Sequence, residues 1–412
     1  MTNIIIATVL FSLFCIKTKR KRGTWACPSM FLILLYLISL CCGIIHIYIE
    51  KETMIGHSSY LPYSFLLVFL MLLYFNGFVS FNEVSANEIV LPNKLWLDRM
   101  STIVIILSFV AIVFFADGVI KVFSMSDLGA ARNNRYIYGD TYVESGLLYT
   151  ICSVSSSLYV FALLLFFIYL IIGGNRNRCV LLFISSFSEV LHVLSEVGRD
   201  GIVFWLFSFI FFYLLFKDYM IEKQTKMIRK VFVIFAALAL IPFMMISAGR
   251  FTENLVGELV SYMGQQFKHF CYYFDITPQP LAFGRGFPLI YEIIREPLPE
   301  PALYSNEYTD SGSFGFFFLS FFVNFGVIGT IVVGIVLTFI QRRLLKLKGN
   351  TIQFNTLFIY ILFFQVFSQG VFYFRHYTRG GNLFIVLCFV FYFISRGMSN
   401  STGSIIITKR ND

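Results

Sequence analysis

Long apolar stretches separated by short polar segments run along the whole chain. A helix of about 20 apolar residues is long enough to cross a bilayer, and eleven stretches approach that length. They cover residues 2–16, 29–49, 62–82, 100–122, 148–172, 179–197, 201–216, 231–249, 314–340, 351–372 and 382–395. The pattern predicts an all-α, polytopic integral membrane protein with about eleven transmembrane helices.

Composition strengthens this prediction and excludes a soluble domain. The chain is 58% hydrophobic and only 13% charged, and its mean hydropathy is +0.76. Soluble domains carry about 25% charged residues. The formal net charge is +9, but the basic residues stand in short runs between apolar stretches. They therefore indicate membrane orientation and do not predict a nucleic-acid partner.

Charge order sets the expected orientation. The first stretch has no positive charge before it and the run KTKRKR after it, the reverse of a secretory signal peptide, which predicts a retained anchor with its N-terminus outside. Alternation then assigns these segments to the cytoplasm: 17–28, 83–99, 173–178, 217–230, 341–350 and the tail from 396. They hold 21 of the 32 Lys and Arg but 6 of the 23 Asp and Glu. We predict an N-out, C-in protein.

The sequence thus predicts one transmembrane domain over 1–412, with two longer external loops at 123–147 and 250–313. The first half of the larger loop has apolar residues at helical spacing, which favours an interfacial helix; they are Leu255, Leu259, Tyr262, Met263 and Phe267. Six of the ten prolines follow between 278 and 301 and favour a stiff, shaped segment. The alternative is a plain connector.

One predicted span carries a polar stripe. Ser185, Glu189, His192 and Glu196 recur at i, i+4, i+7 and i+11, and Arg199 and Asp200 follow at the outer end. An ionisable residue at membrane depth costs on the order of 3 kcal/mol unless it faces protein or water. The stripe therefore predicts a cavity open to the outside. The alternatives are buried hydrogen bonding between helices for Glu189 and His192, and a solvated turn for Arg199 and Asp200.

Further basic residues fall in the other external loops, where the orientation rule disfavours positive charge. These residues are Arg132, Arg135, Arg250, Arg285, Arg375, His376 and Arg379. The planar guanidinium binds phosphate oxygens in a bidentate manner. Any single such arginine is better explained by a surface charge or an interfacial anchor. Arginines from four separate loops favour a lipid-linked diphosphate as the ligand.

Motifs of other chemistries are missing from the sequence. It contains no Walker-type nucleotide loop, no H-E-x-x-H zinc pattern, no G-x-S-x-G elbow and no Asp-x-Asp pair. The five histidines are scattered, and of the eight cysteines only Cys271 lies in a longer external loop. We therefore predict no metal, no cofactor and no disulfide framework.

The chain as a whole resembles the O-antigen polymerases (Wzy-type) of Gram-negative inner membranes. The resemblance covers the number of spans, the richness in Phe, Leu and Ile, and three local segments: SEVGRDGIVFW, GRGFPLIYEII and SGSFGFFFLSFFVNFGVIGTIVVGIV. Some members carry Arg, ten residues and then Gly in external loops; Arg135 and Gly146 fit this spacing, whereas Arg250, Arg285 and Arg295 do not.

The resemblance implies a GT-C-like membrane glycosyltransferase that polymerises oligosaccharide repeat units on undecaprenyl diphosphate at the periplasmic face of the bacterial inner membrane. In that expectation Arg199, Arg250 and Arg285 bind the diphosphate, and Arg375 and Arg379 support them. Asp200 is the candidate general base, with His376 and Glu196 behind it. The weaker substrate-binding candidates are Arg132, Arg135, Glu189 and His192. A chain-length regulator and membrane lipid are the candidate partners.

Two other functions stay open. An O-antigen ligase-like transferase would use the same lipid donor, and its loss would leave no repeat unit on the core, whereas loss of a polymerase leaves one. A lipid-linked oligosaccharide flippase or secondary transporter would use the polar stripe as a proton path. Such transporters are built from internal repeats, and this sequence shows none.

Overall fold

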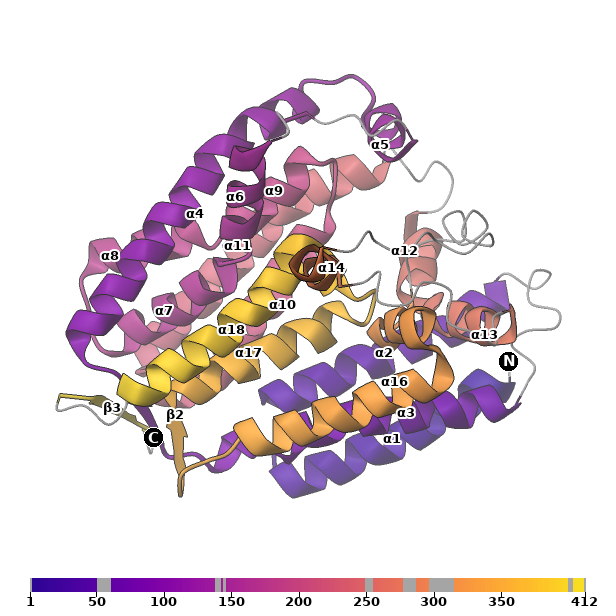
Figure 1. The fold of residues 1–412 in the computed structure, drawn as a ribbon, viewed down its shortest axis with the longest axis horizontal. Coiled ribbons are helices and arrows are strands. Elements are labelled where there is room, and N and C mark those ends of the chain that lie inside the picture. The colour runs from indigo at the N-terminus through magenta and orange to yellow at the C-terminus, as the bar shows by residue number, and fades with distance from the viewer. Residues whose placement is uncertain are drawn as a thin grey trace. The chain divides into compact units, whose positions relative to one another are not determined.

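The computed structural model describes residues 2–49, 61–137, 142–143, 146–248, 255–276, 287–295, 315–398 and 403–410. Every predicted span has a helical counterpart (Figure 1). The helices are α1 (Thr2–Arg22), α2 (Pro28–Ile49), α3 (Leu61–Ser80), α4 (Lys94–Phe123), α6 (Leu147–Ser156) with α7 (Tyr159–Ile171), α8 (Arg176–Ser185) with α9 (Ser188–Ser195), α10 (Asp200–Phe216), α11 (Glu222–Ala248), α16 (Phe317–Leu344), α17 (Phe354–Gln369) and α18 (Arg379–Met398).

Ten helical segments in the described ranges are long and apolar enough to cross a membrane, counting α6–α7 and α8–α9 as one span each. The remaining predicted span, 351–372, corresponds to α17, which is apolar but only 16 residues long. Side chains facing outward from α4 include Ile103, Val113 and Ile120, at 58%, 72% and 69% exposure. Such an apolar outer face suits a surface in contact with lipid hydrocarbon.

The chain forms two compact units. Unit 1 comprises Met1–Ser85, Val256–Lys348 and Thr356–Val390; unit 2 comprises Ala86–Leu255, Gly349–Asn355 and Phe391–Asp412. In unit 1, α3 packs against α1 and α16, and aromatic rings fill the interior. Tyr36 stacks on Phe316 at 5.5 Å between ring centroids, and Phe78 stacks on Tyr360 at 4.7 Å. In unit 2, α4 lies along α6 and α9 (Figure 1).

A buried ion pair joins the ends of α1 and α3 in unit 1. Arg22 Nη2 lies 3.1 Å from Glu83 Oε2, and the two side chains are 0% and 2% exposed. Arg22 also donates to the carbonyl oxygen of Val79 at 2.7 Å, near the C-terminus of α3, where helix carbonyls lack helical partners. Ser29 donates its backbone N–H and its hydroxyl to Glu83 Oε1. The segment 17–28 is thus fixed to the segment that follows α3.

A small sheet, which the sequence analysis did not predict, joins two segments assigned to the cytoplasm to the first residues of the predicted span 351–372. Its strands are β1 (Glu88–Leu91), β2 (Thr351–Gln353) and β3 (Ile405–Thr408), in the order β2-β1-β3. β1 pairs in parallel with β2 and antiparallel with β3. The sheet lies entirely within unit 2.

Two more of the segments assigned to the cytoplasm, 173–178 and 217–230, contact the segments that carry β1 and β3. Arg178, at the start of α8, forms an ion pair with Asp98 near the start of α4. The carbonyl oxygen of Asp218 accepts from the backbone N–H of Arg410 at 2.9 Å, and its carboxylate lies 3.6 Å from Lys409 Nζ. Five segments are therefore neighbours at one end of the unit 2 helices: 83–99, 173–178, 217–230, 349–353 and the tail. Which side of the membrane this end faces stays a prediction.

Part of the predicted external loops is also described. Residues 128–137 form α5 (Leu128–Ile137), and the predicted interfacial helix is divided into α12 (Leu255–Gly264) and α13 (Gln266–Ile276). Gly264 packs against the backbone of Cys42 and Gly43 in α2, so this segment lies against α2. A short helix, α14 (Pro288–Ile294), follows. Pro288 is the one proline of the proline-rich segment that falls within the described residues.

Candidate functional site

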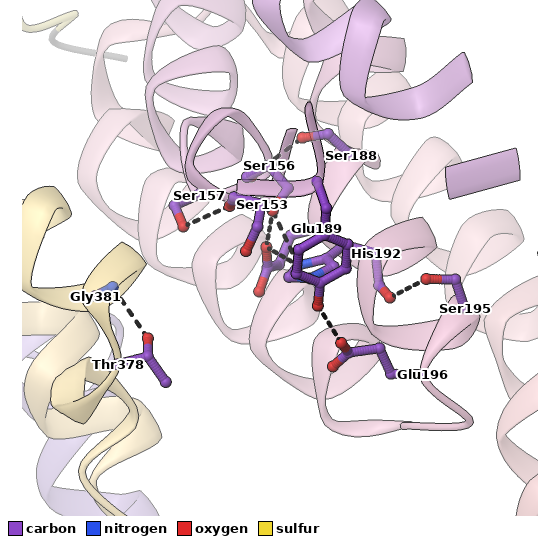
Figure 2. A network of polar contacts seen from close by, with 11 residues as sticks. Ser153, Ser156, Ser157, Ser188, Glu189, His192, Ser195, Glu196, Thr378 and Gly381 are labelled. Carbon is purple, nitrogen blue, oxygen red and sulfur yellow. Dashed lines mark hydrogen bonds and ion pairs between the residues drawn. The ribbon is translucent and has the colours of Figure 1, made fainter. Parts of the chain in front are cut away.

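The polar stripe forms a hydrogen-bonded cluster inside unit 2. Ser156 Oγ lies 2.7 Å from Glu189 Oε2 and 3.0 Å from His192 Nδ1, and the ring nitrogen lies 3.5 Å from the same carboxylate oxygen (Figure 2). The side chains of Glu189 and His192 are 6% and 12% exposed. The ring of Phe115, on α4, covers the imidazole at 4.4 Å. For Glu189 and His192 the structure thus shows buried hydrogen bonding between helices, the alternative to an open cavity.

Two interrupted helices meet at this cluster. The span α6–α7 is broken at Ser157 and Leu158, and the span α8–α9 at Ser186 and Phe187. At both breaks the backbone N–H groups bond three residues back, as in a 3₁₀-helix. Ser188 donates its hydroxyl to the carbonyl oxygen of Ser156 at 3.1 Å, so one break is bonded to the other helix. Short 3₁₀ stretches inside membrane helices free backbone groups and often mark functional hinges.

The link between α9 and α10 carries the next predicted residues. Glu196, the last residue of the stripe, accepts a hydrogen bond from the Tyr149 hydroxyl. Val197, fully buried, has a φ of +55°, a conformation that costs a β-branched residue about 1–3 kcal/mol. Arg132 on α5 donates to the carbonyl oxygen of Val197 at 2.8 Å. The guanidinium of a second segment, also predicted to be external, therefore supports the strained link.

Arg199 and Asp200 complete this link. Arg199 is 4% exposed, donates to Ser247 Oγ at 2.5 Å and lies 5.3 Å from the ring centroid of Phe243, both on α11. The solvated turn considered above is therefore wrong for Arg199. Asp200 is the first residue of α10 and half-buried, where a negative charge interacts favourably with the helix dipole.

The remaining described candidates lie in unit 1. Arg375 and His376 belong to the 3₁₀ turn η4 (Arg375–Tyr377), and Arg379 begins α18. Arg379 forms an ion pair with Glu292 on α14. His376 is 5% exposed, between the rings of Phe374 and Phe384. The Asn382 side chain donates to the carbonyl oxygen of His376 at 2.6 Å and accepts from the N–H of Leu289 at 3.4 Å.

The structure therefore brings the described candidates together as two clusters. The unit 2 cluster contains Arg132, Glu189, His192, Glu196, Arg199 and Asp200, and the unit 1 cluster contains Arg375, His376 and Arg379. Arg135 lies one helical turn after Arg132 on α5, and its side chain is outside the described part. Arg250 and Arg285 lie outside the described residues.

Sequence reasoning missed Ser156, Tyr149 and Ser247, each of which bonds a predicted residue. The serine-rich run SSS at 155–157 inside an apolar span was the available signal for the first. Tyr149 and Ser247 carry no local signal, because single hydroxyl residues are common in membrane helices. Across the described ranges, no group of three or more His, Cys, Asp or Glu side chains could hold a metal ion.

Helices of this length and apolarity, with ionisable side chains enclosed among them, define a multi-pass α-helical membrane protein. Beyond this class, no family model, no curated protein and no solved structure matches the chain.

Proposed function

We propose that the protein is a membrane glycosyltransferase with GT-C-like architecture that polymerises undecaprenyl-diphosphate-linked oligosaccharides into O-antigen polysaccharide. The proposal places it in the bacterial inner membrane, N-out and C-in, with its active face toward the periplasm. It rests on the resemblance in sequence given above and on one observation in unit 2. Arginines from two segments predicted to be external, Arg132 and Arg199, lie at the α9–α10 link.

The position of Ser247 extends this observation. Ser247 accepts from Arg199 and lies three residues before Arg250, so the loop that carries Arg250 starts beside the link. The proposal is that the segment following α11 joins the other two predicted external segments there. A set of arginines in a water-poor site stabilises the charge that develops on a leaving diphosphate, because the donors are oriented before the reaction begins.

In the proposed reaction a sugar hydroxyl of the new lipid-linked unit attacks the anomeric carbon of the growing chain. The bond from that carbon to the diphosphate oxygen breaks, and undecaprenyl diphosphate leaves with the electron pair. Asp200 takes the hydroxyl proton as general base, with Glu196 and His376 as the other candidates. Arg199, Arg250 and Arg285 hold the diphosphate, with Arg375 and Arg379 in support.

The test is a lipopolysaccharide gel from a deletion strain complemented with variants. We expect Arg199→Ala to abolish the long-chain ladder and leave a single repeat unit on the core, because losing one oriented donor typically lowers rate by about 10²–10³. Arg199→Lys should restore little, since an ammonium lacks the planar fork. Arg343→Ala, at an exposed arginine near the end of α16, is the matched control and should keep the ladder.

Immunoblots of the membrane fraction must show equal amounts of all variants. A wild-type ladder from a well-inserted Arg199→Ala protein would remove Arg199 from the mechanism. A deletion strain that still makes the ladder would overturn the polymerase itself, and one whose core carries no repeat unit would point to the ligase-like transferase or to a flippase instead.

The Ser156–Glu189–His192 cluster favours a second candidate, an ion-coupled flippase or secondary transporter. Ionisable groups enclosed at interrupted helices are characteristic of such proteins. A flippase supplies the lipid-linked unit to the outer face, so its loss leaves the core without any unit. The deletion phenotype therefore separates this candidate from the polymerase.

A further inference from the structure

Three hydrogen-bond contacts converge on the Ser156 hydroxyl oxygen. Glu189 Oε2 lies at 2.7 Å, the carbonyl oxygen of Ser153 at 2.8 Å and His192 Nδ1 at 3.0 Å (Figure 2). A serine hydroxyl has one hydrogen to donate and two lone pairs with which to accept. Of the three contacts, Ser156 can therefore donate in one and must accept in the other two.

The hydrogens of these contacts can be assigned from the partners. The carbonyl oxygen of Ser153 has no hydrogen, so that contact requires the hydroxyl hydrogen of Ser156. The imidazole supplies its own hydrogen when Nδ1 is protonated. The contact with Glu189 is then a hydrogen bond only if the carboxyl group carries a proton and donates it to Ser156 Oγ.

The surroundings favour the same protonation state. An ionised carboxylate at membrane depth costs on the order of 3 kcal/mol, and the Glu189 side chain is 6% exposed. A charged imidazole would bear a hydrogen on Nε2, a nitrogen that is buried and has no hydrogen-bond partner. Leaving such a donor unsatisfied costs about 1–3 kcal/mol. A protonated Glu189 avoids the cost of a buried carboxylate.

Among the described residues, the titratable groups on the helices packed against α9 have the following placements. On α4, Asp117 and Lys121 pair with each other at 68% and 56% exposure. On α6, the Tyr149 hydroxyl bonds Glu196, and Cys152 packs against Phe115. At and along α10 the remaining groups are Arg199, Asp200 and Tyr213, of which Arg199 bonds Ser247. On α11 they are Glu222, Lys223, Lys226, Arg229 and Lys230, all in the first turns of that helix.

We propose that Ser156, Glu189 and His192 form a proton-binding site within the membrane span, with the bound proton on the Glu189 carboxyl group. The site stands between the two helix breaks, and α9 connects it to the link that carries Glu196 and Arg199. After release of the proton, the Glu189 carboxylate could no longer donate to Ser156 Oγ. The Ser156 hydroxyl would then donate to the carboxylate and no longer to the carbonyl oxygen of Ser153. The site holds a proton whether or not the protein transfers sugars.

Also, Ser156 and Glu189 both contact the Nδ1 side of the imidazole. In a catalytic triad the nucleophile and the orienting carboxylate bond opposite ring nitrogens. This cluster therefore binds a proton and does not activate Ser156 as a nucleophile.

Infrared spectroscopy of the full chain in lipid nanodiscs tests the proposal. We expect the wild-type spectrum minus that of Glu189→Gln to contain the C=O stretch of a protonated carboxyl group at neutral pH, shifted in D₂O. The band should disappear at high pH as the proton is released. Glu196→Gln, at a carboxylate bonded to Tyr149, is the matched control and should retain the band.

If that difference spectrum at neutral pH contained only the bands of an ionised carboxylate, the proposal would be overturned. Labelling with dicyclohexylcarbodiimide, an apolar reagent that adds to protonated carboxyl groups, provides a second measurement if Glu189→Gln does not fold. Mass spectrometry should locate the adduct on Glu189 in the wild-type protein, with yield falling as pH rises. Equal yields across that pH range would likewise contradict a titrating site.

Discussion

Individual charged residues in this protein differ most in how far they are removed from solvent. The Arg22–Glu83 pair is enclosed, whereas the pair of Asp117 with Lys121 is more than half exposed. Removing one partner of a buried pair leaves an uncompensated charge, which costs about 3–5 kcal/mol. An exposed pair contributes about 0–1 kcal/mol. The two pairs therefore form a matched comparison.

We expect Glu83→Ala to lower the free energy of unfolding by about 3–5 kcal/mol, and Lys121→Ala to change it by less than about 1 kcal/mol. Replacing both partners, with Arg22→Met and Glu83→Leu, should recover much of the loss because no lone charge remains. Unfolding in detergent followed by tryptophan fluorescence measures all three. Similar losses for Glu83→Ala and Lys121→Ala would show that burial does not set the strength of this pair.

For these individual residues, sequence reasoning identified the polar positions from Glu189 to Asp200 but not their hydrogen-bond partners. Spacing along a helix shows which residues share a face, and it correctly grouped Glu189, His192 and Glu196. It cannot show whether that face meets water or another helix, because this depends on residues distant in sequence, such as Ser156 and Ser247. The burial of Arg199 follows from such a partner.

Among the helices and strands, close contact between α12 and α2 depends on glycine. A Cβ atom at Gly264 would lie 2.5 Å from the carbonyl carbon and oxygen of Cys42 and 2.6 Å from the nitrogen of Gly43. These are backbone atoms, which cannot move aside as a flexible side chain can. The two helices can therefore approach this closely only without a side chain at Gly264.

We expect Gly264→Ala to separate α12 from α2 and to destabilise the protein by about 1–3 kcal/mol, as overpacking does. The matched control is Gly397→Ala in the last turn of α18, where a Cβ would meet nothing within 4 Å. There the better helix propensity of alanine should leave stability unchanged or raise it by up to about 1 kcal/mol. Thermal unfolding in the same detergent compares them. Equal stability of the two variants would argue against the close packing.

Hydropathy located the spans but neither the helix breaks nor the sheet. A window of about 20 residues averages over a two-residue break such as Ser157 and Leu158, because the flanking residues stay apolar. The strands are three or four residues long and pair with partners far along the chain, so no local pattern identifies them. Arg250 and Arg285 lie outside the described residues, and their convergence on the site stays a prediction.

For the molecule as a whole, the distribution of Lys and Arg predicts which segments share a side of the membrane. In unit 2, residues from five segments assigned to the cytoplasm are neighbours. The contacts are the pairing of β1 with β3, the hydrogen bond from the backbone N–H of Asn87 to the carbonyl oxygen of Asn350, and the contacts of Asp98 and Asp218. Segments on opposite sides of a bilayer could not pair in this way, since its hydrocarbon core is about 30 Å thick. The grouping therefore agrees with the alternation of spans.

Cysteine accessibility tests the absolute orientation. In intact spheroplasts we expect a membrane-impermeant maleimide to label Ser126→Cys, between α4 and α5, but not Lys348→Cys, between α16 and β2. Both positions are exposed, so access depends on the side of the membrane. Permeabilised membranes should give labelling of both, which is the control. The reverse pattern in intact cells would invert the proposed topology and place the α9–α10 link in the cytoplasm.

The sheet also has a consequence for how the protein is made. β1 is synthesised early, but its antiparallel partner β3 emerges more than 300 residues later, a delay on the order of 15 to 60 s at usual translation rates. Until β2 is made, β1 has two open edges, and until β3 is made it keeps one, able to pair with another nascent chain. β3 is therefore the last strand to join the sheet. A ribosome that stalls before residue 405 leaves a protein whose described membrane helices are all made but whose sheet lacks its third strand.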